Sequence, residues 1–209
     1  MPVKKINKKV VKKVVKKPVK KKIKQGKPRK KTTTKLPAKL VKYLEKSGIH
    51  HEVLEHRTVY TAFDAAATMK KKMNEIAKAL YVKADKDYYV VVLPADQNLD
   101  FKKLAKCISQ STTRPIKVVK IPGEKIMLNA LKMKKGALTA FGKLHKLPVV
   151  VEKNLSKAKK VAFSSGSFNH SIEMAAKDFV RLEEATLGSF GEKKVIKKQK
   201  VTKPKKKKK

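Results

Sequence analysis

Apolar and polar positions in residues 36–192 follow patterns that predict short helices and short strands in turn. Leu40, Tyr43 and Leu44 share one face of a helix that Gly48 would end, and the apolar run YYVVVL at 88–93 predicts a buried strand. Further strands are predicted at 50–56, 116–120, 147–152, 161–165 and 170–174, and further helices at 61–69, 73–80, 100–108, 124–135 and 175–186. This alternation favours an α/β (α+β) class, with a single compact domain in which helices surround a mixed sheet.

The two ends of the chain lack this pattern. Residues 1–35 hold 17 Lys and Arg, residues 193–209 hold 11 Lys, and neither segment contains an acidic residue. Such runs repel themselves and bury little apolar surface, so we expect two disordered basic arms around a body at 36–192. The body carries +12 of the formal net charge of +40.

This excess of positive charge predicts a polyanionic partner, because lysines that contact phosphates release condensed counterions. Nucleic acid is the leading candidate, and the arms would bind it through Lys12, Lys13, Lys16, Lys17, Lys20, Lys21, Lys205 and Lys206. No apolar run approaches the roughly 20 residues that cross a bilayer, so no membrane partner is expected. Cys107 is the only cysteine, which suits a reducing compartment, and we expect the protein in the cytoplasm.

Three segments hold candidate site residues. Lys78 lies at the predicted helix-to-strand boundary, just before the apolar residues 79–82, where an ammonium could face a cleft, although a plain surface lysine is the alternative. GALTAFG at 136–142 could bring backbone N–H groups close to a ligand or could be a helix cap followed by a strand and a turn. SSGSFNH at 164–170 is either a polar loop at a pocket mouth or a serine-rich turn.

Other kinds of chemistry find little support in the sequence. The chain lacks a GxGxxG turn, a Walker loop and a GxSxG elbow, which argues against dinucleotide-binding, NTPase and α/β-hydrolase functions. One Cys and five scattered His do not supply the close ligands of a structural zinc site. We therefore expect neither a metal nor a cofactor.

Taken in order, the segments resemble the YbaK/prolyl-tRNA-synthetase editing-domain family of aminoacyl-tRNA deacylases. TAFDAAA at 61–67 is similar to the family's Thr-x-x-x-Ala-Ala opening, and Lys78 stands where the family has its signature lysine. VVVLPADQNLDFKKLAK at 90–106 resembles the family's strand, turn and helix. GALTAFG resembles its glycine loop, and FSSGSFNHSIEMAAKDFVRL at 163–182 resembles its closing strand–helix unit.

The resemblance runs from about Leu40 to Leu187 and implies a fold, an activity and a site. The activity is hydrolysis, in trans, of the ester in mischarged tRNA without a cofactor. The implied partner is tRNA, with an aminoacyl-tRNA synthetase as a further candidate. Lys78 would hold the 3′-terminal phosphate or the carbonyl region, and a ribose hydroxyl of the substrate would help to activate water. Backbone N–H groups around Gly136 and Gly142 would polarise the ester carbonyl, and the pocket would be shaped by Thr61, Phe141, Ser165, Gly166 and His170.

Two positions depart from the family's pattern, and two other functions stay open. Ala140 stands where the family usually has proline, and Leu131-Lys132 stand in place of a Thr-Gly pair, at positions that line the pocket in the family. These departures favour the first alternative, a non-catalytic RNA- or DNA-binding protein that keeps the fold. The second alternative is a DNA-compacting protein in which the lysine arms matter most.

Overall fold

The computed structural model describes residues 36–133 and 136–193. These residues all belong to one compact unit. The expected arms lie outside the described residues apart from Lys193, and so do the eight lysines that we expect to bind nucleic acid.

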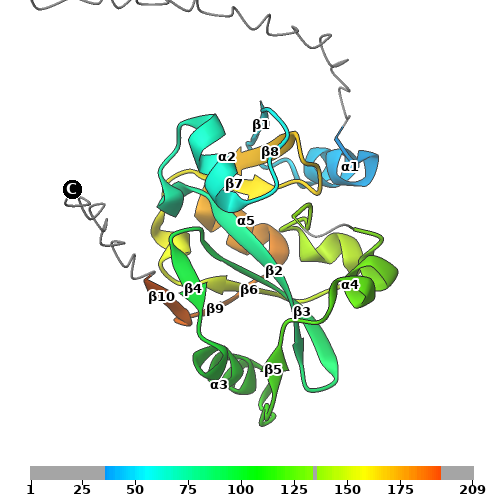
Figure 1. The fold of residues 1–209 in the computed structure, drawn as a ribbon, viewed down its shortest axis with the longest axis vertical. Helices are drawn as coiled ribbons and strands as arrows, with labels where there is room; N and C mark the ends of the chain where they lie inside the picture. The colour runs from blue at the N-terminus through cyan, green and yellow to red at the C-terminus, as the bar shows by residue number, and fades with distance from the viewer. Residues whose placement is uncertain (1–35, 134–135, 194–209) are drawn as a thin grey trace, which may run out of the picture. The chain divides into compact units, whose positions relative to one another are not determined.

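A five-stranded mixed sheet, in the order β5-β2-β3-β6-β9, forms the centre of the domain (Figure 1). The antiparallel pair β2–β3 runs from Ala77↔Pro94 to Ala84↔Asp87, whereas β3–β6 and β6–β9 are parallel. The predicted mixed sheet is therefore confirmed. The strands are β5 (Val119–Lys120), β2 (Ala77–Ala84), β3 (Asp87–Pro94), β6 (Val149–Glu152) and β9 (Thr186–Gly188).

Two smaller sheets and several helices surround the central sheet (Figure 1). An antiparallel sheet has the order β1-β8-β7, and β10 pairs with β4. Their bounds are β1 (Glu52–Glu55), β8 (His170–Met174), β7 (Val161–Ser164), β10 (Gly191–Lys193) and β4 (Gln97–Leu99). The helices are α1 (Ala38–Ser47), α2 (Ala62–Met69), α3 (Phe101–Thr112), α4 (Glu124–Leu131) and α5 (Ala176–Glu183), with 3-10 turns η1 (Met73–Glu75), η2 (Gly142–His145) and η3 (Leu155–Lys157).

The core lies on both faces of the central sheet. Successive residues of a strand point to opposite faces, so Val90 and Val92 pack toward α1 and α5 while Val91 and Leu93 pack toward α3. Burial on both faces explains why β3 is an almost continuous apolar run rather than an alternating one.

Side-chain caps set several helix ends where the sequence predicted them. The Thr61 hydroxyl accepts the Asp64 amide at 3.1 Å and begins α2, and the Asp100 carboxylate accepts two amides of the first turn of α3. Gly48 ends α1 with a φ of 64°, in the left-handed region that suits glycine.

Three predictions about the elements are wrong. The helix predicted at 73–80 is instead η1 followed by β2, because pairing with β3 along eight residues outweighs the helix propensity of its alanines. The helix predicted at 124–135 ends at Leu131, where Lys132 adopts a φ of 56°. The body does not close with a helix at 186, because α5 ends at Glu183 and β9 and β10 follow it.

Candidate active site

A cavity lies along one edge of β2. β3 covers the other edge of this strand completely, whereas β5 pairs only with Lys83 and Ala84. At the start of β2 a single bridge joins Ile76 to Ala162 of β7. β7 and β5 therefore diverge, and no strand of the described residues pairs with this edge between the two contacts. The cavity occupies the gap that they leave.

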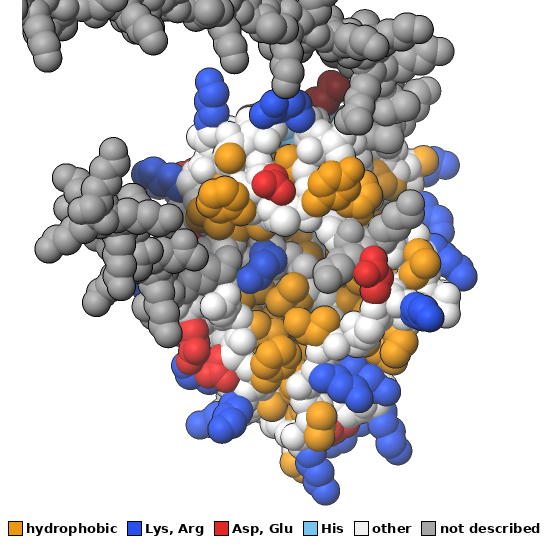
Figure 2. Space-filling view, viewed as in Figure 1, with side chains coloured by type: hydrophobic (Ala, Val, Ile, Leu, Met, Phe, Trp, Pro, Cys, Tyr) orange, Lys and Arg blue, Asp and Glu red, His pale blue; other side chains and the backbone are white. Residues whose placement is uncertain are grey.

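The cavity has a volume of about 610 Å³, which lies within the range of small-molecule sites. Its walls come from α2, the first half of β2, residues 121–124, the loop that contains Gly136, and the ends of β7 and β8. Figure 2 shows hydrophobic side chains lining the hollow at the centre of this face. The polar and charged lining residues are few, namely His56, Thr61, Lys78, Glu124, Ser164, Ser167 and Ser171.

Lys78 lies inside β2, not at the helix-to-strand boundary that the sequence suggested. Its side chain is partly buried, and Nζ donates a hydrogen bond of 2.8 Å to the main-chain oxygen of Gln97. Gln97 begins β4, so the turn between β3 and β4 fixes the ammonium at the cavity wall. Thr61 and Gly136 line the same cavity, and the structure thus brings three of the predicted site residues together.

His56 and Ser171 form a hydrogen-bonded pair on another wall, and the sequence did not single them out. Nδ1 of His56 lies 2.9 Å from the carbonyl oxygen of Arg57, which can only accept, so in the neutral ring Nδ1 carries the proton. Nε2 is then an acceptor, and the Ser171 hydroxyl donates to it at 2.9 Å. These residues are 115 positions apart, and only the pairing of β1 with β8 brings them together.

The predicted glycine loop meets the cavity only at its beginning. Gly136 has a φ of 85°, and a Cβ placed on it would lie 2.8 Å from the main-chain oxygen of Tyr60, so only glycine fits there without strain. Phe141 is fully buried in the core, and the amide of Lys143, the residue after Gly142, donates to the buried carboxylate of Glu183 at 2.9 Å. Phe141 and Gly142 therefore lie outside the cavity lining.

The turn between β7 and β8 borders the cavity and contains the other predicted residues. The Ser165 hydroxyl donates to the main-chain oxygen of His170 at 2.6 Å and accepts the Ser167 amide at 3.3 Å, while Gly166 takes a φ of 89°. Ser164 and Ser167 line the cavity, whereas Ser165, Gly166 and His170 do not. The structure thus places these three where they shape the turn that presents their neighbours.

Two aromatic side chains stand at the mouth. Tyr60 lines the cavity yet is 66% exposed, and its ring centroid lies 5.1 Å from that of Phe168. Deeper in the cavity, burial and the neighbouring Tyr88 raise the pKa of Tyr81, whose phenol therefore stays neutral at physiological pH. The exposed ring of Tyr60 offers a flat face on which a base or another planar group can stack.

Comparison with known proteins places this site within one family. The family model of the aminoacyl-tRNA editing domain matches residues 56–182. The chain belongs to this family. The matched range contains Lys78, the His56–Ser171 pair and every lining residue of the cavity.

Solved structures share the fold of this editing domain. A hypothetical protein, APE2540, is 21% identical over 74% of this chain and 99% of its own, with a TM-score of 0.65. A proposed trans-editing enzyme for prolyl tRNA synthetase is 19% identical over 76% of this chain and 99% of its own, with a TM-score of 0.62. No functionally curated protein matches the sequence.

The two departures from the family pattern lie outside the cavity of this editing domain. Ala140 is fully buried, and its amide donates to the main-chain oxygen of Ser164 at 3.0 Å, a hydrogen bond that proline could not form. Lys132 is the exposed residue that ends α4. Neither position therefore contributes to the lining of the cavity.

The described part of the editing domain shows neither a metal-binding cluster nor a membrane-spanning helix. Within residues 36–133 and 136–193, no group of three or more His, Cys, Asp and Glu side chains is arranged to hold a metal ion. In the same part of the chain, no helix has the length and apolar character needed to span a membrane.

Proposed function

We propose that this editing domain acts in trans on mischarged tRNA and hydrolyses the ester between the wrong amino acid and the terminal ribose. The observation that carries the proposal is the cavity itself, which lies within the family match and has Lys78 fixed at its wall. Its largely apolar lining suits an uncharged amino-acid side chain and the adenine base, and Tyr60 at the mouth offers a ring for stacking.

The reaction needs a positioned water and stabilisation of the charge that develops on the carbonyl oxygen. The water oxygen bonds to the carbonyl carbon, the bond from that carbon to the ribose oxygen breaks, and the ribose oxygen takes up a proton. Lys78 would hold the terminal phosphate or the carbonyl region, and main-chain N–H groups near Gly136 would polarise the ester. We leave Gly142 out of this role because it does not line the cavity.

The His56–Ser171 pair supplies a route for the proton of the water. Ser171 already donates to Nε2 of His56, so it can pass its own proton to the ring as it accepts one from the attacking water. The carbonyl oxygen of Arg57 holds the ring in the required tautomer. A ribose hydroxyl of the substrate remains the second candidate for this step, and removal of Ser171 separates the two.

Release of labelled amino acid from a panel of mischarged tRNAs tests the proposal. We expect rapid release from at least one tRNA, and a loss of about 100-fold or more in a Lys78→Ala protein. Lys83→Ala is the matched control, because Lys83 lies on the same strand but lies outside the cavity and faces the Tyr88 ring at 5.4 Å. Undiminished release by Lys78→Ala would refute the role of Lys78.

The same panel decides between the enzyme and the non-catalytic alternative. If no tRNA is hydrolysed while tight, salt-sensitive binding persists, the protein is a binding module with this fold. The two departures no longer favour that alternative, because neither Ala140 nor Lys132 lines the cavity. For the basic arms we propose affinity through phosphate contacts, which lowers KM and leaves turnover at saturation nearly unchanged.

A further inference from the structure

A second depression lies between α3 and the segment that enters β5. Residues 101–109 of α3 form one side, residues 116–119 form the other, and the volume is about 530 Å³. Three of its nine lining residues are the exposed lysines Lys102, Lys106 and Lys117, and none is acidic. We call this depression the α3–β5 groove. In Figure 2, basic side chains gather over the lower part of the face, where Figure 1 places α3 and β5.

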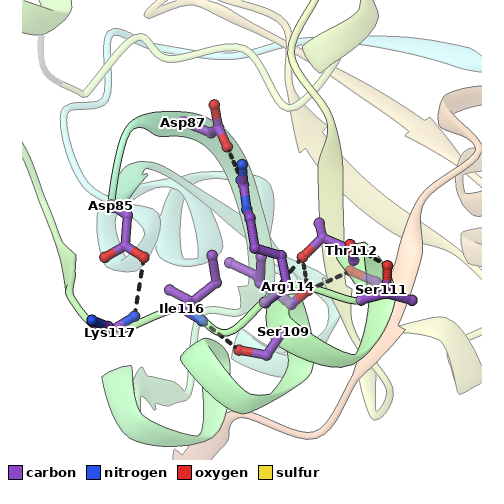
Figure 3. A network of polar contacts seen from close by, with 10 residues as sticks. Asp85, Asp87, Ser109, Ser111, Thr112, Arg114, Ile116 and Lys117 are labelled. Atoms are coloured by element: carbon purple, nitrogen blue, oxygen red, sulfur yellow. Dashed lines mark hydrogen bonds and ion pairs between the residues drawn. The ribbon is translucent and has the colours of Figure 1, made fainter.

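Hydrogen bonds hold the two sides of the α3–β5 groove together (Figure 3). The Ser109 hydroxyl accepts the Ile116 amide at 2.9 Å and donates to a main-chain oxygen one turn earlier in α3. The Asp85 carboxylate accepts the amides of Lys117 and Val118 at 3.1 and 2.8 Å. The groove is therefore formed before any ligand binds.

The basic residues around the groove fall into two kinds. Arg114 is paired with Asp87, and Lys103 lies within 3.2 Å of two carboxylates. The side chains of Lys102, Lys106 and Lys117 form no ion pair with any residue that the structure describes. Since Lys102 and Lys106 are one helical turn apart, they present their charges on one face of α3.

The α3–β5 groove and the cavity are neighbours along the chain. Val119 lines the groove and Ile121 lines the cavity, and two residues of chain span at most about 7 Å. Val118 and Ile121 are 56% and 52% exposed, so the segment between the two sites presents apolar surface as well as charge. A ligand that fills the cavity and continues beyond it toward β5 therefore meets the lysines next.

We propose that the α3–β5 groove binds the phosphate backbone of the base-paired acceptor arm of the tRNA whose single-stranded 3′ end enters the cavity. The identity of this RNA rests on the proposed function. Lysines bind phosphates as point charges without reading sequence, which suits a site that must accept an acceptor arm through its backbone. The absence of acidic lining residues complements a polyanion, and exposed apolar atoms of Phe101 and Val118 can pack against ribose.

The test compares two RNAs and two triple variants of the full chain. The RNAs are an uncharged hairpin with an acceptor stem and a single-stranded 3′ end, and a short oligonucleotide that contains that end alone. The groove variant is Lys102→Ala/Lys106→Ala/Lys117→Ala. The control is Lys153→Ala/Lys157→Ala/Lys159→Ala, which removes the same charge between β6 and β7, on the side of the sheet away from β5.

We expect the groove variant to raise the Kd for the hairpin about tenfold at 0.1 M salt and to reduce its log–log salt slope by about two to three. The control should change that Kd less than about twofold. The two variants should change the Kd for the short oligonucleotide to the same extent. A groove variant with Arg in place of the three lysines should retain affinity. Thermal unfolding of each variant verifies that the fold is intact.

Three outcomes would overturn the proposal. Equal losses in the two triple variants would mean that total charge matters and the groove does not. If the groove variant bound the hairpin with the same Kd as the wild type, the groove would not be an RNA site, whether or not the wild type hydrolyses mischarged tRNA. Binding of an acidic peptide that depends on the three lysines, without any dependence for RNA, would assign the groove to a protein. A further outcome is that the wild type hydrolyses none of the mischarged tRNAs while the Kd values still follow the expected pattern. In that case the proposed reaction is refuted, and the groove remains an RNA-binding site.

Discussion

The cavity and the α3–β5 groove border the same short stretch of chain, residues 119–121, and differ in almost every physical property. The cavity is mostly apolar and has one lysine, which is partly buried and hydrogen-bonded to the chain. The groove is open and has three exposed lysines and no acidic residue. A hydrogen bond in the cavity is shielded from solvent, whereas the charge of the groove acts in water and is screened by salt.

This difference assigns different parts of the reaction to the two sites. Groups that touch the ester change the rate of the chemical step, whereas groups that touch remote phosphates change binding of substrate and transition state alike. Cavity variants should therefore alter turnover at saturating tRNA without altering the salt slope. Groove variants should alter Kd and the salt slope and leave saturated turnover unchanged. Each prediction below tests this division.

Removal of the Ser171 hydroxyl should have the largest effect. We expect Ser171→Ala to lower turnover at saturation by about 100-fold or more, because it removes the hydroxyl that transfers a proton from water to His56. His56→Ala should lose a similar factor, and the double variant should lose little more than either alone, since the two act as a unit. Single-turnover release of labelled amino acid measures this.

Ser167→Ala is the control for that experiment. Ser167 also lines the cavity, but its hydroxyl contacts His170 and the turn and not His56. Its removal should cost less than tenfold. If Ser171→Ala retained full activity, the substrate's own ribose hydroxyl would be the group that activates water.

Gly136→Ala should have the next largest effect, because it presses on the mouth of the cavity. The new Cβ would lie 2.8 Å from the Tyr60 oxygen, so the loop or Tyr60 must shift. Gly48→Ala is the matched control, since Gly48 also has a positive φ but no atom within 4 Å of a new Cβ. We expect Gly136→Ala to destabilise the fold by about 1–2 kcal/mol more than Gly48→Ala and to lower turnover as well. Thermal unfolding and release kinetics measure the two effects, and equal losses in both variants would show that the contact with Tyr60 has no cost.

Ser109→Ala should loosen the wall of the groove and leave the cavity unaffected. The Ile116 amide would lose its acceptor, at a cost of about 1 kcal/mol, and the Kd for the hairpin should rise about threefold. Ser111→Ala removes a hydroxyl from the same helix end, where it bonds only to Ile108, and should leave that Kd unchanged. A fall in saturated turnover after Ser109→Ala would contradict the division between the sites.

The sequence predicted those parts of the fold that depend on local chemistry. The helix ends at Thr61, Asp100 and Gly48 are set by hydrogen bonds within one helical turn, and the sequence predicted helices that begin or end at these residues. The apolar run at 88–93 identified β3, because a strand buried on both faces needs apolar residues at every position. The prediction of a helix at 73–80 was wrong for the opposite reason, since the conformation of these residues is decided by pairing with β3 and not by their own helix propensity.

The candidate site was predictable only where a family motif marks its residues. Lys78, Thr61 and Gly136 were found by their resemblance to family motifs, and they do line the cavity. The His56–Ser171 pair was not found, because three histidines fall within 50–56 and nothing in the sequence joins one of them to a serine in β8. Phe141 and Gly142 stand in the same motif as Gly136, but a loop that turns into the core carries its later residues away from the cavity.

The pH dependence of the groove wall gives the smallest expected effect. The Lys117 and Val118 amides hold the pKa of the Asp85 carboxyl below its ordinary value of 3.8, against weak opposition from burial. A carboxyl whose pKa is lowered by folding stabilises the fold above the unfolded pKa, and this contribution is lost as the pH falls through the folded value. The two amides should therefore be protected from hydrogen exchange at neutral pH and should lose part of that protection below about pH 4.

In Asp85→Asn one acceptor oxygen remains for two amides, so protection at pH 7 should already be reduced, by less than about tenfold because the site is exposed. Amide exchange followed by NMR makes the measurement, with Asp178→Asn in α5 as the control for loss of an exposed carboxylate. Equal protection in wild type and Asp85→Asn would mean that Ser109 alone holds the wall, and the groove would then owe its shape to α3 and not to the turn between β2 and β3.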